Sequence, residues 1–382
     1  MTRVAPPRRV LVAPQEFKGT LGPLEAAAAI AAGVRAALPD AEVIELPMAD
    51  GGPGTVAIVA AATGATLVRH TVTGPQGDPV EAAYALIERP DAPALAVIEA
   101  AAAAGLVLVP AERRDPVRAT SFGTGEQILD AIVRGAREVI VGVGGTGTND
   151  GGAGAAQALG LRLLDPDGAP LPRGGIALAR LARVERGTAE AVRELDLRIA
   201  VDVQNPLLGA RGATAVYGAQ KGVRDWQAPA FNAALANWAT QLREDLGLDL
   251  AERPGAGAGG GFPMGLLAAC PRGRIESGAA LVADAIGLRA AIEAADLVIT
   301  GEGAMDGQTG YGKAVAHVAA LARDAGVRCV AVAGIVEGLP GGIDDAEALA
   351  PTPADRTDAI AHPAEHAAAA AARLIHRLLS DR

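Results

Sequence analysis

Short runs of aliphatic and β-branched residues alternate along this chain with Ala-rich segments of helical length, and this alternation constrains the fold more than any other feature. The aliphatic runs predict strands at 10–13, 42–46, 138–143, 198–203, 296–300 and 327–333. The segments between them predict helices at 23–38, from about 55, and at 125–134, 153–159, 228–245, 313–325 and 364–379. Two Pro- and Gly-rich stretches, 71–79 and 336–356, are interpreted as a linker or turn and a surface loop. Strands that alternate with helices predict an α/β fold with a mainly parallel sheet.

Length and composition further narrow the class of protein to which this chain can belong. The 382 residues are enough for two domains at ~150 residues each, and half of them are apolar. Aromatic residues make up only 2%, so the core must consist mainly of Ala, Val, Leu and Ile. The net charge of −10 without a basic stripe argues against nucleic acid as a partner. No signal-peptide pattern or long apolar run is present, so we expect a soluble cytoplasmic protein without a membrane segment.

Polar, glycine-rich motifs follow four of the predicted strands. In parallel α/β sheets, ligands bind beyond the carboxyl ends of the strands, so these motifs are expected to form parts of one cleft. The residues concerned are Lys18, Asp50, Gly51, Gly52, Asp202, Asn205, Gly301 and Glu302.

Only three of the 34 basic residues are lysines, and each of them has a glycine as a neighbour. The three are Lys18, Lys221 and Lys313. A lysine is a compact point charge that suits phosphate, and an adjacent glycine lets a ligand approach the backbone closely. The pattern favours a phosphate-handling site, and the alternative is a chance placement of surface lysines in a Gly-rich chain.

Two glycine-rich segments resemble nucleotide-binding motifs. Residues 307–313 fit G-x-x-x-x-G-K, but Ala314 replaces the hydroxyl residue that would bind Mg²⁺. Residues 142–147 fit G-x-G-x-x-G after a predicted strand, which leaves a dinucleotide site as an alternative. The polar loop continues through Thr148, Asn149 and Asp150, and this favours phosphate or substrate binding together with an anionic metal ligand.

Phosphoryl transfer needs a base for the acceptor hydroxyl, cations for the phosphates and oxygen ligands for Mg²⁺. Candidate carboxylates are Asp50, Asp202, Glu302 and Asp306. Asp202 ends an aliphatic strand, where burial would raise its pKa and suit it to act as the base. Each of these residues taken alone is also consistent with a turn carboxylate that caps backbone N–H groups.

Taken together, the motifs resemble those of the type-1 glycerate kinase family, and they occur in the family's order along nearly the whole chain. The matching segments are 13–19 (APQEFKG), 47–55 (PMADGGPGT), 120–126 (TSFGTGE), 147–154 (GTNDGGAG), 202–207 (DVQNPL), 220–222 (QKG), 254–260 (PGAGAGG), 300–309 (TGEGAMDGQT) and 312–313 (GK). Three positions depart from the family pattern: Gln15-Glu16 replaces Asp-Ser, Pro53 replaces Glu, and Ala304 replaces Arg.

The resemblance implies two α/β domains with the active-site cleft between them. We expect a Rossmann-like domain from residues 1–70 and 290–382 and a second α/β domain inserted at 71–289. The implied reaction transfers a phosphoryl group from ATP, with Mg²⁺, to glycerate. A homo-oligomer is possible.

Roles for individual residues follow from residue type and motif position. Asp202 is assigned as the base with Asp306 as the alternative, and Lys18 is placed with them in the catalytic set. Phosphate or substrate contacts are assigned to Lys221, Lys313, Asn205, Thr148, Asn149, Gly51, Gly52 and Gly301. Metal contacts are assigned to Asp50, Asp150 and Glu302. A kinase of another small hydroxy acid and a non-catalytic nucleotide or metabolite sensor remain alternatives, and the sequence does not fix which hydroxyl is phosphorylated.

Overall fold

The computed structural model describes residues 6–305 and 313–380. The chain forms two compact units: the first comprises Met1–Asp50 and Ala279–Arg382, and the second comprises Gly51–Gly278. Both boundaries lie upstream of those expected from the sequence, at 70/71 and 289/290. Strand β3 (Thr66–Thr73) crosses the expected boundary at 70 and pairs along its length with β4 (Pro79–Arg89), so the chain has already entered the second unit there.

The first unit is built on a five-stranded parallel sheet in the order β13-β12-β11-β1-β2. Its strands are β1 (Arg9–Val12), β2 (Glu42–Glu45), β11 (Leu297–Met305), β12 (Arg328–Val336) and β13 (Asp345–Ala348). Its helices are α1 (Pro23–Ala37), α10 (Gly278–Ala285), α11 (Leu288–Glu293), α12 (Lys313–Ala325), α13 (Arg356–Ala361) and α14 (Pro363–Ser380). Counted within this unit, the strand order is 2-1-3-4-5, a doubly wound arrangement of the Rossmann-like class. The predicted α/β class is therefore confirmed.

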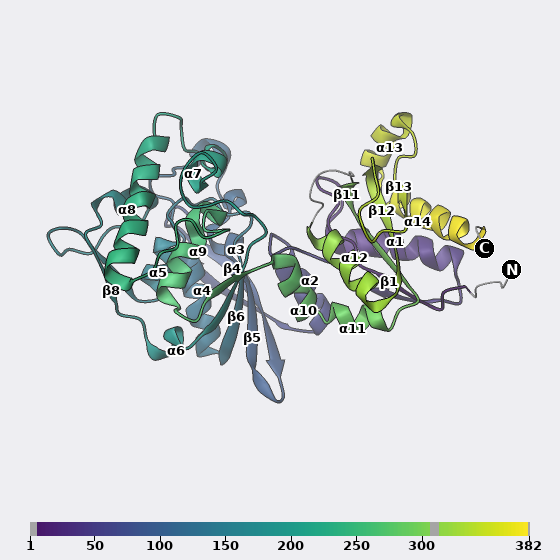
Figure 1. Ribbon diagram of the computed structural model, residues 1–382, viewed down its shortest axis with the longest axis horizontal. Coiled ribbons are helices and arrows are strands. Elements are labelled where there is room, and N and C mark those ends of the chain that lie inside the picture. Colours follow the sequence, from purple (N-terminus) through teal and green to yellow (C-terminus); the bar gives the residue numbers. More distant parts are fainter. Residues whose placement is uncertain (1–5, 306–312, 381–382) are drawn as a thin grey trace. The chain divides into compact units, whose positions relative to one another are not determined.

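Alanine and glycine allow the helices of the first unit to pack closely. Helices α1 and α14 run side by side, and their Ala-rich faces are buried with β1, β11 and β12 in one core (Figure 1). A Cβ atom on Gly33 would lie 2.0 Å from the carbonyl oxygen of Ala368, so only glycine fits at this crossing. The contact joins the two ends of the chain within one unit.

The second unit contains a six-stranded mixed sheet in the order β10-β9-β6-β5-β4-β3. Its remaining strands are β5 (Ala92–Glu99), β6 (Ala136–Gly142), β9 (Asp196–Ala200) and β10 (Arg274–Glu276), with β7 (Leu161–Leu164) and β8 (Arg183–Arg186) in a separate two-stranded ribbon. Its helices are α2 (Thr55–Thr63), α3 (Ala100–Ala104), α4 (Phe122–Val133), α5 (Ala153–Ala158), α6 (Glu190–Arg193), α7 (Ala213–Tyr217), α8 (Ala228–Leu246) and α9 (Ala258–Ala269). Strands β5, β6, β9 and β10 are parallel, whereas β4 is antiparallel to both of its neighbours.

Two loop predictions from the sequence were correct only in part: residues 74–78 form the turn between β3 and β4, but the flanking residues of the stretch 71–79 belong to these strands. Residues 71–73 end strand β3, and β13 lies inside the stretch 336–356. Strands β3, β4, β5, β7, β8 and β10 were not predicted from the sequence either. Strand β3 (TLVRHTVT) buries only part of its length and carries polar residues in between, so it lacks the continuous apolar run of a central parallel strand.

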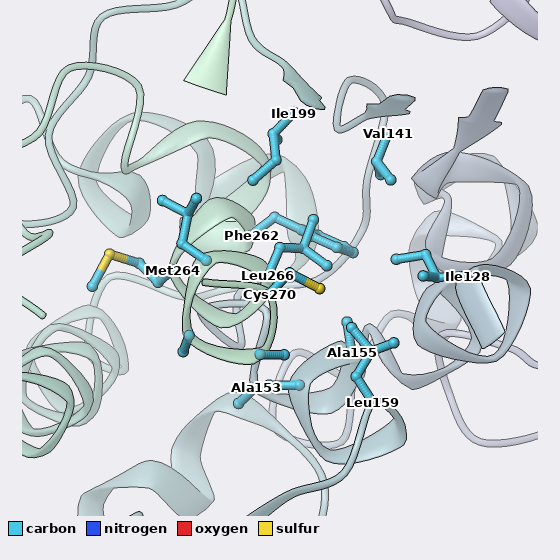
Figure 2. Packing of buried hydrophobic residues seen from close by; sticks show 14 of the residues in the cluster. Ile128, Val141, Ala153, Ala155, Leu159, Ile199, Phe262, Met264, Leu266 and Cys270 are labelled. Carbon is cyan, nitrogen blue, oxygen red and sulfur yellow. The ribbon is translucent and has the colours of Figure 1, made fainter. Parts of the chain in front are cut away.

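The core of the second unit packs α4, α5 and α9 against β6 and β9 (Figure 2). Ile128, Leu159 and Phe262 are wholly or almost wholly buried there. Three consecutive glycines, Gly259 to Gly261, adopt left-handed φ values of 60°, 83° and 86° and interrupt α9 near its start. Within the two described ranges, no helix has both the length and the apolarity that a membrane span requires.

Candidate functional site

At the carboxyl edge of the second unit's sheet, glycines bring three segments into close contact. A Cβ atom on Gly142, the last residue of β6, would lie 1.8 Å from the carbonyl oxygen of Gly51. A Cβ atom on Gly51 would lie 2.7 Å from the Cβ of Ala200, which ends β9. The predicted site residue Gly51 therefore lies against the ends of β6 and β9, and Gly52 lies against Gly144 just beyond β6, so no side chain fits between these backbones.

Asp150 lies in the loop that follows β6, and its carboxylate is fully engaged by hydrogen bonds within the protein. Its Oδ2 accepts bonds from the Ser121 backbone N (2.8 Å), the Ser121 hydroxyl (2.7 Å) and the Gly154 N (3.2 Å). Its Oδ1 accepts a bond from the Gly152 N at 3.1 Å. Burial raises the pKa of Asp150, and the four hydrogen bonds oppose that shift. The geometry gives Asp150 a structural task, which is to hold the starts of α4 and α5 together.

Lys221 is also buried, with 3% of its surface exposed. Its Nζ donates to the carbonyl oxygen of Thr148 at 2.7 Å and to the hydroxyl of Thr146 at 3.4 Å. A Cβ atom on Gly260 would lie 2.2 Å from the same Thr148 oxygen, so the loop preceding Phe262 packs directly on this strand-end loop. Lys221 therefore connects the backbone of the loop after β6 to the segment before α8.

Burial lowers the pKa of Lys221 from its ordinary value near 10.5 to about 7, although the charge of Asp150 opposes the shift. Between pH 7 and 10.5 the unfolded chain then binds more protons at this residue than the folded chain. The free energy of unfolding should therefore rise with pH across this window, with a slope approaching ~1.4 kcal/mol per pH unit. Below pH 7 Lys221 is protonated in both states, so the folded protein bears the full cost of burying the ammonium there. The variant Lys221→Met should lack this slope.

Tryptophan fluorescence is the appropriate measurement, because Trp226 and Trp238 are the protein's two tryptophans and both lie in the second unit. Trp238 is wholly buried, and its Nε1 donates to the carbonyl oxygen of Gly151 at 3.0 Å, next to Asp150. Guanidinium unfolding of wild type and Lys221→Met at several pH values gives the two slopes. Parallel pH profiles would show that Lys221 stays protonated in the folded protein.

Two buried polar atoms of the same loop have no hydrogen-bond partner among the described residues. They are the hydroxyl oxygen of Thr148 and Oδ1 of Asn149. The amide nitrogen of Asn149 donates to the hydroxyl of Thr214 on α7 at 2.9 Å. Because unpaired buried polar atoms are costly, these two acceptors mark the polar place in this loop where a bound molecule or water would gain hydrogen bonds.

Asp202 follows β9 and is partly exposed. Its Oδ1 accepts hydrogen bonds from the hydroxyl of Ser277 (3.1 Å) and from the N–H of Gly278 (3.2 Å), both just beyond β10. These bonds orient the carboxylate at the carboxyl edge of the sheet. Asn205, three residues further on, accepts from Tyr217 at 2.8 Å and donates to the carbonyl oxygen of Arg211 at 2.8 Å, so its side chain shapes this loop.

The first unit carries its own set of predicted residues at the carboxyl edge of its sheet. The Gln15 backbone N donates to the carbonyl oxygen of Gly301 (2.8 Å), and its side-chain amide donates to Asp50 Oδ2 (3.3 Å). Phe17 is buried, whereas Lys18 is exposed in the turn that follows β1. Glu302 lies on β11, next to Gly301. A Cβ atom on Gly301 would lie 2.1 Å from the carbonyl oxygen of Val332, so this position requires glycine.

Some predicted residues cannot be placed in this way. Asp306 and most of the P-loop-like segment 307–313 lie outside the described residues, and so does the side chain of Lys313, which begins α12. Among the residues that the structure describes, no three His, Cys, Asp or Glu side chains gather as a metal cluster. The structure buries Thr148, Asn149, Asp150 and Lys221, with Lys221 bonded to the carbonyl oxygen of Thr148, and it places Asp202 and Asn205 in one loop.

Sequence reasoning missed Glu99, which ends β5. Its Oε1 accepts a hydrogen bond from the Val56 N–H at 2.7 Å, close to the start of α2. Burial raises the pKa of Glu99, while the backbone N–H groups of Val56 and Gly54 oppose the shift. A carboxylate at a helix N-terminus is a stabilising arrangement. Glu99 was missed because strand β5, which it ends, was not predicted. Its position at the end of that strand is the signal that would have indicated it.

Glycine-rich loops, lysines and carboxylates at the carboxyl edges of parallel strands are typical of α/β enzymes that bind phosphorylated small molecules. The model of the glycerate kinase family matches residues 10–379 of this chain. The chain therefore belongs to the glycerate kinase family, and the resemblance stated from the motifs is confirmed.

Named relatives agree with this assignment. The chain is 43% identical over 327 residues to a glycerate kinase of Halalkalibacterium halodurans, with 85% of each chain covered. It is 40% identical over 364 residues to a glycerate kinase of Bacillus subtilis, with 94% of each covered. It is 41% identical over 329 residues to a glycerate 2-kinase of Escherichia coli, with 85% of each covered. A solved glycerate kinase 2 structure from Salmonella typhimurium LT2 superposes with a TM-score of 0.87 at 39% identity and covers 98% of both chains.

Proposed function

We propose that this chain transfers the γ-phosphoryl group of ATP to a hydroxyl of glycerate, giving phosphoglycerate and ADP. The observation that carries the proposal is the family match over residues 10–379, which includes every motif quoted above. The name of the Escherichia coli relative, glycerate 2-kinase, favours the 2-hydroxyl as acceptor. Dependence on ATP also supports a cytoplasmic location.

Asp202 is the proposed base. In the transfer, the acceptor oxygen forms a bond to the γ-phosphorus, the bond from that phosphorus to the ADP oxygen breaks, and the hydroxyl proton passes to the Asp202 carboxylate. The bonds from Ser277 and Gly278 to one carboxylate oxygen support this role, because they fix the orientation of the group. Asp306 remains the alternative base.

Cations and loop donors complete the proposed site. Lys18 is exposed at the end of β1 and is suited to neutralise phosphate charge, and we assign the same task to Lys313. Thr148, Asn149 and Asn205 supply polar groups for the substrate, while Gly51, Gly52 and Gly301 let backbones approach. The buried Lys221 is proposed to act indirectly, because its hydrogen bond to the Thr148 carbonyl oxygen holds the substrate loop in place.

Mg²⁺ is the proposed metal. Mg²⁺ is usually held by one or two carboxylates together with substrate phosphates, so a dedicated three-residue cluster is not required. Asp50 and Glu302 fit this donor set, because both present carboxylates at the carboxyl edge of the first unit's sheet. Asp150 fits it less well, because both of its oxygens already accept hydrogen bonds. When bound, Mg²⁺ would neutralise charge on the phosphates.

The test is ADP release by the purified chain from Mg-ATP with and without D-glycerate, with the product identified by ³¹P NMR. We expect glycerate-dependent ADP release and a single phosphoglycerate, whose spectrum distinguishes the 2- from the 3-phosphate. A panel of other small hydroxy acids is the control for acceptor identity. Turnover with another acid but not with glycerate would contradict the proposed acceptor, and binding of ATP without turnover on any acid would favour a sensor.

A further inference from the structure

The strand order of the first unit identifies one place where a ligand is expected. From neighbouring central strands β1 and β11, the chain proceeds in opposite directions, to β2 on one side and to β12 and β13 on the other. In doubly wound sheets, ligands bind outside the carboxyl ends of the strands at this switch point. A cavity of about 380 Å³ lies there, formed by the segments that follow β1 and β13, the ends of β11 and β12, and helix α13. Its size is in the usual range for small-molecule sites.

The cavity has an apolar wall and a backbone floor. Leu349, Ala359 and Ile335 contribute apolar surface, while Gly303 and Gly334 lack side chains. A Cβ atom on Gly334 would lie 2.3 Å from the carbonyl oxygen of Gly303, so the floor cannot accept a larger residue there. Ile360 on α13 also lines the cavity, and with 67% of its surface exposed it has apolar area available to contact a ligand.

The charged residues of the cavity are cations. Lys18 and Arg356 both line it, and no acidic residue does among those that the structure describes. Two nearby carboxylates are already engaged: Asp355 accepts bonds from the backbone and hydroxyl of Thr352, and Asp358 pairs with His366 at 2.7 Å. An apolar chamber with two cations suits a ligand that has one flat apolar end and one polyanionic end.

We infer that this cavity takes the nucleoside end of the phosphoryl donor, an adenine nucleotide, with its base against Ile335, Leu349 and Ile360 and its phosphates towards Lys18 and Arg356. The inference rests on the proposed function, because that function supplies ATP as the ligand. It places the donor's base at the β1/β11 switch point of the first unit, apart from the glycine-rich sequence 142–147 that resembles a dinucleotide fingerprint.

The test uses the full chain and measures binding of ADP and ATP directly by calorimetry, without glycerate. Ile360→Glu places a negative charge and a polar group on the apolar wall, and we expect it to raise the Kd for ADP about tenfold or more, which corresponds to the loss of one good contact. Arg356→Gln, at an exposed residue whose loss should not disturb folding, is expected to weaken ATP binding and to reduce its dependence on salt. The matched control is Leu339→Glu, because Leu339 is an exposed aliphatic residue of the same unit, at 51%, outside the cavity.

Each result bears on the inference separately from the proposed reaction. An unchanged Kd for ADP in Ile360→Glu with an unaltered melting temperature would overturn the inference, even if the wild type phosphorylates glycerate. Failure of the wild type to bind ADP or ATP would also overturn the inference. If the chain then phosphorylated glycerate from a donor that lacks adenine, the proposed kinase activity would stand without the nucleotide cavity. Weakened ADP binding in Ile360→Glu together with no turnover on glycerate would support the cavity and reject the proposed acceptor.

Discussion

Replacing Asp202 with Asn is expected to lower kcat by about 10²- to 10⁴-fold, the usual contribution of a positioned base. An amide cannot take the proton of the acceptor hydroxyl. Its oxygen can still accept the hydrogen bonds from Ser277 and Gly278, so the loop after β9 should keep its conformation. The measurement is glycerate-dependent ADP release at saturating substrates, with the melting temperature recorded in parallel.

The matched control for this variant lies on the same strand. Asp196 begins β9, at the end opposite the site, and pairs with Arg274, so Asp196→Asn should keep kcat near the wild-type value. A near-wild-type kcat in Asp202→Asn would refute the assignment. If Asp306→Asn then abolished turnover, the base would be Asp306.

Asp150→Ala is expected to lower the free energy of unfolding of the second unit by ~3–5 kcal/mol, because each buried donor left without its acceptor costs about 1–3 kcal/mol. The substitution leaves the N–H groups of Ser121, Gly152 and Gly154 without their acceptor, and it removes the negative charge that opposes the lowered pKa of Lys221. Denaturant unfolding followed by tryptophan fluorescence reports on this unit, because Trp238 donates to Gly151 beside the network.

Asp225→Ala is the control, because Asp225 is an exposed aspartate of the same unit and should change stability by less than about 0.5 kcal/mol. The metal assignment predicts a different result for Asp150→Ala. If the variant unfolds like the wild type but needs far more Mg²⁺ for turnover, Asp150 is a metal contact and the structural assignment is wrong.

Local patterns predicted most of the parallel framework. Central strands such as β12 are buried on both faces over several consecutive residues, so the apolar run from Cys329 to Ala333 is visible directly in the sequence. The antiparallel strands β3 and β4 were missed because their stability comes from pairing with each other rather than from a local apolar run. The same strands moved the unit boundary upstream of residue 70, since pairing between distant residues is not visible in a local window.

Some site residues were likewise found from local motifs, whereas the roles of others depend on contacts with distant segments. Lys18 and Asp202 lie at strand ends, as their motifs indicated, because a parallel sheet places every such loop at one edge. No sequence pattern indicated that Lys221 is buried or that Asp150 is surrounded by N–H donors from two helix starts. Burial and hydrogen bonding depend on distant residues, as in the bond from Lys221 to Thr146, 75 positions away in the chain. These contacts decide whether a charged group contacts a ligand or supports the loop that does.

The sequence by itself determined the α/β class, the family and the identity of the residues at the strand ends. Each of these depends on local composition, on the period of the apolar residues or on short motifs. Only the tertiary structure decided the 2-1-3-4-5 strand order, the cavity at its switch point and the buried network around Asp150. These features arise because packing brings segments such as 17–20 and 349–360 together, and no local pattern specifies which distant segments will pack against each other.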